Sequence, residues 1–165
     1  IELWRAPETR EPRSYFGGTA GLSSTALDYF RFSQMILNGG KLNGVRLLSP
    51  STVNLMITNH TGDFPIYIKG SDGYGFGLGF SMVTDPAEAR LAITPGTFGW
   101  GGAWGTVFWI DPTEELITSL MVQITSYRHF NIRQDVANMA MQAITESLYA
   151  GQQKIRGYKE IPRRR

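Results

Sequence analysis

The segment from Gly99 to Thr106 has the composition of a site that binds a ligand through its backbone. Four glycines and two tryptophans lie within these eight residues, which read Gly-Trp-Gly-Gly-Ala-Trp-Gly-Thr. Glycine in a strand permits another backbone or a ligand to approach closely, and each indole offers a large apolar surface with one donor. The alternative is a tight turn with two packing tryptophans. Composition alone does not decide between a bare strand edge and a packed turn.

Catalytic sets of other kinds are missing from the sequence. It has no cysteine, which excludes thiolate catalysis, disulfides and cysteine-bound zinc. His60 and His129 are the only histidines and lack a metal-ligand spacing, so we interpret both as surface or capping residues and expect neither metal nor cofactor. No Gly-x-Ser-x-Gly elbow is present. The glycines at 75, 77 and 79 lack the nucleotide-binding spacing, and no paired carboxylates indicate glycoside chemistry.

Length and charge narrow the class of protein. The chain has 165 residues, a net charge of +2 and 42% hydrophobic residues, which is typical of one globular domain. Its one dense basic cluster is an arginine triplet at 163–165, so we expect no nucleic acid as partner. No apolar run approaches the roughly 20 residues of a membrane span. The first residue is isoleucine, and we expect a piece of a longer chain, for which a cytoplasmic or periplasmic location and the oligomeric state both stay open.

Hydrophobic periodicity predicts an α+β fold. Thr25 with Asp28 predicts a capping box before a helix that Gly39 and Gly40 end, and Ser49-Pro50 predicts the start of a second helix. Four strands then follow, at Tyr74–Phe80, Phe98–Gly102, Gly105–Ile110 and Glu115–Ile124. A long amphipathic helix over 130–149 precedes a polar tail at 151–165. We therefore expect an antiparallel sheet meander closed by a C-terminal helix.

Several motifs in order resemble the β-lactamase-like serine hydrolases, whose fold is also that of the DD-peptidases and penicillin-binding proteins. The similar stretches are 17–32, 37–50, 74–80 and 98–102, and together they span most of residues 15–125. The nearest group is that of the class C β-lactamase-related esterases (family VIII carboxylesterases), which often have Trp-Gly-Gly where β-lactamases have Lys-Thr-Gly.

The resemblance implies an acyl-enzyme mechanism built from three motifs. A Ser-x-x-Lys motif supplies the nucleophile and its base, a Tyr-x-Asn-type motif moves protons, and a third motif lines the substrate from a sheet edge. In this chain the third motif is Trp100-Gly101-Gly102. The amide of Ala103, next along the strand, is the implied oxyanion-hole donor, and Trp100 is expected to pack against the acyl or leaving group. Further substrate contacts are implied at the acyl-pocket loop and the rim, namely Thr19, Ala20, Tyr74 and Trp104.

The first two motifs are absent from these 165 residues. No serine precedes a lysine by three, and no Tyr-x-Asn occurs. We therefore expect residues 1–165 to be the C-terminal portion of one such domain, lacking the N-terminal segment with the nucleophile, inactive alone and prone to aggregate through an exposed sheet edge. The expected substrate is a small ester or amide. A β-lactamase, a D-amino-acid peptidase, a non-catalytic acyl- or peptidoglycan-binding relative and a purely structural domain stay open, although Trp100 in place of lysine argues against strong binding of a β-lactam carboxylate.

Overall fold

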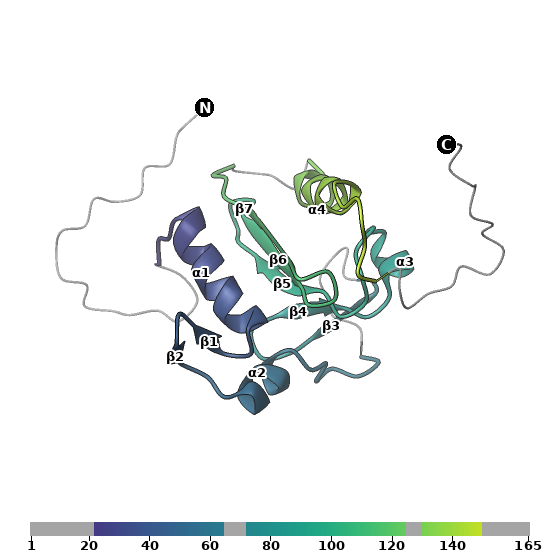
Figure 1. Cartoon of the computed structure of the whole chain (residues 1–165). Coiled ribbons are helices and arrows are strands. Elements are labelled where there is room, and N and C mark those ends of the chain that lie inside the picture. Colours follow the sequence, from purple (N-terminus) through teal and green to yellow (C-terminus); the bar gives the residue numbers. More distant parts are fainter. Residues whose placement is uncertain (1–21, 65–71, 125–129, 150–165) are drawn as a thin grey trace, which may run out of the picture.

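A five-stranded antiparallel sheet with helices on both faces forms the structure, a computed structural model that describes residues 22–64, 72–124 and 130–149 (Figure 1). The strands lie in the order β3-β4-β5-β6-β7, and β1 and β2 form a separate hairpin. In chain order the elements are α1 (Ala26–Leu37), β1 (Lys41–Leu42), β2 (Val45–Arg46), α2 (Pro50–Met56), β3 (Tyr74–Phe76), β4 (Ser81–Val83), α3 (Pro86–Ala89), β5 (Phe98–Gly101), β6 (Val107–Asp111), β7 (Leu116–Leu120) and α4 (Ile132–Gln142). The α+β meander with a C-terminal helix is confirmed.

Both N-terminal helices begin where their caps predict. Thr25 Oγ1 accepts the Asp28 amide at 3.2 Å, which is the N-cap half of the predicted capping box. The Asp28 carboxylate accepts the Thr25 hydroxyl at 3.0 Å instead of the Thr25 backbone amide that a capping box would use. Ser49 accepts the amide of Thr52 at the start of α2, with Pro50 at the first helical position. Gly39 and Gly40 end α1 with φ of 64° and 89°, as a left-handed C-terminal cap requires.

The strand predicted over Tyr74–Phe80 is wrong beyond Phe76. Its second half is a turn in which the Gly77 amide bonds the Phe80 carbonyl at 2.8 Å, and Gly79 has a φ of 89°. The chain then reverses into β4, which the sequence analysis did not predict as a separate strand, and it did not predict the short helix α3 either. Glycine alternating with apolar residues fits a strand by its period, but it also makes the turn conformation accessible.

The last helix is shorter than predicted. It covers Ile132–Gln142 rather than 130–149, although the apolar stripe continues to Leu148. The chain beyond it is held by the Glu114 carboxylate, which accepts the amides of Leu148 at 2.9 Å and Tyr149 at 3.2 Å. A tertiary contact therefore replaces the helical bonds there. The strands predicted over 105–110 and 115–124 begin later than predicted, at Val107 and Leu116, because Gly105 and Glu115 have φ of 92° and 51° and lie in turns. The second strand also ends earlier than predicted, at Leu120.

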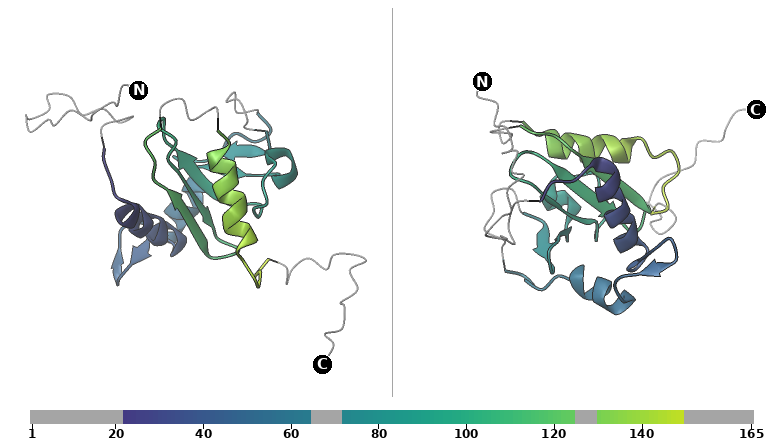
Figure 2. Two further views of the ribbon diagram at one scale, coloured as in Figure 1. Left: turned by 90° about the horizontal axis from the view of Figure 1, so that it is seen from above. Right: turned by 90° about the vertical axis from the view of Figure 1, so that its left-hand side faces the viewer.

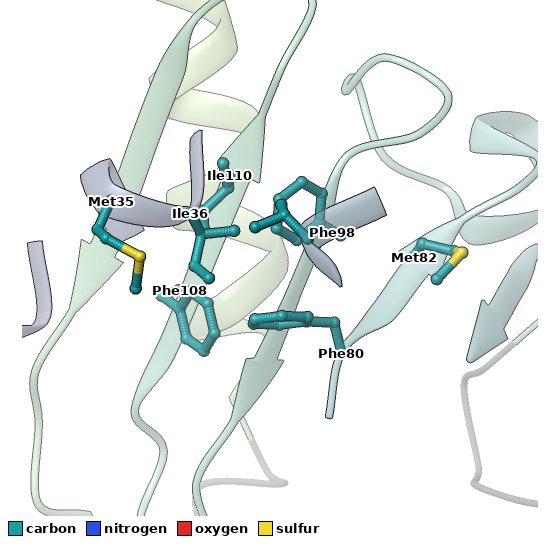
Figure 3. Close-up of a cluster of buried hydrophobic side chains, with 8 residues drawn as sticks. Met35, Ile36, Phe80, Met82, Phe98, Phe108 and Ile110 are labelled. Carbon is teal, nitrogen blue, oxygen red and sulfur yellow. The ribbon is translucent and has the colours of Figure 1, made fainter. Parts of the chain in front are cut away.

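The two sheet faces pack separate apolar clusters. One cluster joins α1 and α2 to the sheet through Met35, Ile36, Val53, Phe80, Met82, Phe98, Phe108 and Ile110, and the aromatic rings of Phe80, Phe98 and Phe108 meet edge to face within it (Figure 3). The other cluster lies under α4 and contains Val83, Leu91, Ile93 and Ala137. Figure 2 shows α1 and α4 on opposite sides of the strands. The sheet is therefore fixed from both faces.

The turn between β6 and β7 is built around a buried carboxylate. Asp111 is 2% exposed, and its Oδ2 accepts the hydroxyls of Thr94 at 2.6 Å and Thr97 at 2.9 Å. Its Oδ1 accepts the amides of Thr113 at 2.9 Å and Glu114 at 3.0 Å. Four donors satisfy this carboxylate, which is what burial of such a group requires.

Among the described residues, the outer edge of β7 has no pairing strand, and α1 carries exposed apolar side chains. β7 pairs with β6 along its inner edge, and Leu27 and Phe30 of α1 are exposed. Within residues 22–64, 72–124 and 130–149, no helix combines the length and the apolar character that crossing a membrane requires.

Candidate active site

The strand β5 has a backbone edge that is only half covered. β6 pairs with it along its whole length, whereas β4 pairs with Phe98 through Met82 and with Gly99 through Ser81. β4 begins at Ser81. Among the residues that the structure describes, no strand faces Trp100 and Gly101 on that side.

Hydrogen-bond alternation shows which backbone groups face the uncovered side. Gly102 donates its amide to the Thr106 carbonyl at 2.9 Å, so Gly102 directs its amide toward β6. Ser81 Oγ donates to the Gly99 carbonyl at 3.1 Å, so Gly99 faces β4. Successive residues of an antiparallel strand alternate in this way. The amide and carbonyl of Gly101 therefore point to the side that β4 leaves uncovered.

Trp100 forms an aromatic wall beside this edge. Its side chain is 41% exposed, and its ring meets that of Phe76 edge to face, with centroids 4.9 Å apart and planes at 90°. Phe76 is held at the end of β3 because its amide donates to Asn59 Oδ1 at 3.2 Å and its carbonyl accepts the His60 amide at 2.8 Å. The sequence analysis missed Phe76, which carried no signal beyond its place in an alternating run.

Ala103 lies in the turn after β5 rather than in the strand. Gly102 and Gly105 close this turn through an amide-to-carbonyl bond of 3.2 Å, and Ala103 at its tip is exposed. Within the described part of the chain, the Ala103 amide donates to no other group. Trp104 follows it, half-buried, and its carbonyl accepts the Ile124 amide at 2.9 Å. The turn that follows the uncovered edge therefore contains an exposed amide that has no acceptor among the described residues.

The other predicted substrate contacts are placed differently. Tyr74 stacks on Trp109 at 6.3 Å and belongs to the cluster under α4, where burial raises the pKa of its hydroxyl to about 12. The β3 residue that contacts Trp100 is Phe76 and not Tyr74. Thr19 and Ala20 lie outside the described residues, as does the tail 151–165.

Arg133 supports the edge from α4. Its Nη2 donates to the Gly102 carbonyl and, at 2.9 Å, to the Thr106 carbonyl. A Cβ on Gly101 would lie 2.6 Å from its Cζ. The sequence analysis did not single out this residue, although a cation in the first turn of a helix opposes the macrodipole and is a signal of another role.

The site offers recognition groups without proton chemistry of its own. Trp100, Gly101, Gly102 and Ala103 carry no nucleophile, acid or base. His60 Nε2 lies 2.8 Å from the Leu55 carbonyl at the end of α2, as expected of a capping residue. The described residues contain no group of three or more metal-binding side chains. Two hollows lie away from this edge, one of about 10 Å³ under α4 and one of about 180 Å³ between α1 and α2.

Comparisons with known proteins agree with this architecture. The Beta-lactamase family model matches residues 2–138. An uncharacterized protein of Mycobacterium tuberculosis (strain CDC 1551 / Oshkosh) is 42% identical over 124 residues, which cover 68% of this chain and 30% of that protein. An Escherichia coli (strain K12) protein named "Putative D-alanyl-D-alanine carboxypeptidase" is 32% identical over 99 residues, covering 60% of this chain and 21% of that protein. The chain thus spans less than a third of the length of these relatives.

Two solved structures are similar in fold. EstCE1, described as a hydrolase with promiscuous acyltransferase activity, superposes with a TM-score of 0.54 and 26% identity over 70% of this chain and 29% of that one. Simvastatin synthase (LovD) from Aspergillus terreus superposes with a TM-score of 0.50 and 21% identity over 76% of this chain and 33% of that one. The second likeness concerns the fold alone.

Proposed function

Because the chain belongs to the beta-lactamase family, a superfamily of serine hydrolases and acyltransferases, we propose that the full-length protein hydrolyses carboxylic esters through an acyl-enzyme. This chain lines the substrate with the edge Trp100–Ala103. The observation that carries the proposal is the uncovered backbone of Gly101 beside the half-exposed Trp100.

The roles follow from the placement of each group. The ester carbonyl oxygen accepts the Ala103 amide, which stabilises the negative charge that develops there during attack. The acyl portion lies along Gly101, and its apolar part packs on Trp100. The nucleophile is a serine of a Ser-x-x-Lys motif in a segment of the protein that precedes these residues. Its Oγ displaces the alcohol to form an acyl-enzyme, and water then releases the acid.

Trp100 favours a neutral substrate. A tryptophan offers apolar surface and one N–H, whereas a lysine at the same place would attract a carboxylate. A second candidate, a β-lactam or D-alanyl peptide with a free carboxylate, is favoured by the Arg133 guanidinium that lies against Gly101. Its Nη2 already donates to two carbonyls, and we therefore rank the ester first.

The test compares substrates on the full-length protein and on residues 1–165. We expect hydrolysis of 4-nitrophenyl butyrate by the full-length protein at least tenfold faster than hydrolysis of nitrocefin or a D-alanyl-D-alanine peptide. A fluorophosphonate should label the serine of Ser-x-x-Lys, located by peptide mass spectrometry. Residues 1–165 alone should show neither reaction. Turnover by this chain alone, or a full-length protein that neither hydrolyses esters nor is labelled, would contradict the proposal.

A further inference from the structure

We infer that Arg133 is a positioning residue that holds the turn carrying the Ala103 amide, an inference that rests on the proposed function of this edge. Its guanidinium comes from α4, yet it bonds backbone carbonyls of the turn between β5 and β6, 31 and 27 residues earlier in the chain.

The two carbonyls belong to the two arms of the turn. Gly102 follows the end of β5, and Thr106 precedes the start of β6. One nitrogen of a planar and rigid guanidinium bonds both of them, so the arms cannot separate or rotate without losing a charge-assisted hydrogen bond. Ala103 lies between the arms. The orientation of its amide is therefore coupled to the docking of α4.

The backbone at residue 101 leaves space for this guanidinium. A Cβ there would lie 2.6 Å from both Cζ and Nη1 of Arg133 and 2.8 Å from Nη2. Such distances require the arginine to move. Gly101 does not have a positive φ among the described residues, so close approach rather than turn conformation explains the glycine.

Helix electrostatics support the same conclusion. Arg133 is the second residue of α4, where the helix dipole disfavours a cation. A cation at this place is stabilised by the carbonyl oxygens of Gly102 and Thr106, which carry partial negative charge. The position suits the turn rather than the helix.

The first experiment measures ester hydrolysis by full-length Arg133→Ala and Arg133→Lys, with Gln134→Ala as the matched control on an exposed position of the same helix. A displacement of about 1 Å at a reacting centre can cost about 100-fold in rate. We therefore expect Arg133→Ala to lower kcat about 100-fold while KM changes less than threefold. Lysine should restore little, because its single ammonium does not fill the space beside Gly101 that Cζ, Nη1 and Nη2 of the flat guanidinium occupy. Millimolar guanidinium should restore part of kcat in Arg133→Ala and none in the control.

A second readout does not depend on activity. Hydrogen exchange at the Gly102 and Gly105 amides, which bond the Thr106 and Gly102 carbonyls and close the turn around Ala103, should accelerate at least tenfold in Arg133→Ala. Exchange in the middle of β6 should stay unchanged, and Gln134→Ala should change neither the exchange of the turn nor the thermal midpoint. Faster exchange in a protein that hydrolyses no ester would leave the positioning role standing and refute the proposed function. Ester hydrolysis with equal kcat and equal exchange of the Gly102 and Gly105 amides in wild type and Arg133→Ala would refute the positioning role alone.

The glycine gives a third test through a double-mutant cycle. Gly101→Ala should lower kcat strongly when Arg133 is present, because the new methyl group displaces the guanidinium. Added to Arg133→Ala, it should lower kcat less than threefold further, so that the two effects are not additive. Full additivity would show that Gly101 and Arg133 act independently and would overturn the inference.

Discussion

Replacing Trp100 with alanine should reduce ester hydrolysis beyond what its packing explains. The side chain is 41% exposed, so about three-fifths of its surface is buried. Burial of a whole tryptophan removes up to about 250 Å² from water, and the buried part here is therefore about 150 Å². At about 25 cal/mol per Å², this burial contributes about 4 kcal/mol to the free energy of unfolding. The contribution falls to about 2–3 kcal/mol because the unfolded chain is compact and already buries part of this surface.

The matched control is Phe76→Ala, which removes the same edge-to-face contact from the other side. Both variants lose the aromatic pair, worth about 0.5–1.5 kcal/mol beyond area burial, but Trp100→Ala alone removes the wall beside Gly101. We expect kcat/KM with 4-nitrophenyl butyrate to fall at least tenfold further in Trp100→Ala than in Phe76→Ala. The assay is run on full-length protein at a temperature where circular dichroism shows both variants folded.

The reasoning fails under two results. If kcat/KM in Trp100→Ala stays within threefold of wild type, the indole does not contact the substrate. If Phe76→Ala loses as much activity as Trp100→Ala, the aromatic pair acts as packing, and the tryptophan has no separate role in binding.

Three further predictions concern the scaffold, each measured by urea unfolding of the full-length protein. Asp111→Ala should lower the free energy of unfolding by about 3 kcal/mol, because two hydroxyls and two amides lose their acceptor; Asp111→Asn should cost less, since one amide oxygen remains and hydroxyls can turn to accept. Burial raises the pKa of Tyr74 from 10.0 to about 12, so the free energy of unfolding should be undiminished below about pH 10 and fall as the pH rises toward about 12; Tyr74→Phe should reduce that decline, and the part due to the raised pKa of Tyr29 should stay. Thr25→Ala should cost about 1 kcal/mol through loss of the α1 cap, whereas Ser24→Ala should change stability little.

Local signals predicted the helix starts. The bonds between Thr25 and Asp28, and between Ser49 and Thr52, join residues three apart. Each bond joins a side chain to a backbone amide within the first turn of the same helix, so a local sequence pattern suffices to predict it. Strand β7 was found for a similar reason, because a near-continuous apolar run identifies a strand.

Long-range contacts set the features that the sequence did not reveal. Helix α4 stops at Gln142 although its apolar stripe continues, because Glu114 captures the amides of Leu148 and Tyr149. The predicted strand over Tyr74–Phe80 breaks at a turn with a left-handed glycine. In the sequence, glycine alternates with apolar residues through this turn with the same period of two as in a strand. Periodicity reports which face is apolar, and it does not report where a distant carboxylate or a left-handed glycine interrupts the element.

The candidate site divides in the same way. Trp100, Gly101 and Gly102 were identified from composition and motif, and they lie together because they are consecutive. Arg133 reaches the site only through the packing of α4 on the sheet, and Phe76 only through the pairing of β3 with β4. The resemblance covers neither contact, since each depends on tertiary structure.

The glycines of the segment have different reasons to be glycine. Gly105 alone has a positive φ, of 92°, so turn conformation accounts for one of the four. At Gly99 a Cβ would strike the Phe108 carbonyl, at Gly101 the Arg133 guanidinium, and at Gly102 the Thr106 hydroxyl. Each of these neighbours belongs to β6, the turn or α4 and lies on the packed side of the edge. The glycines therefore let the protein pack closely behind β5, and recognition on the open side depends on the indole of Trp100 and the amides of Gly101 and Ala103.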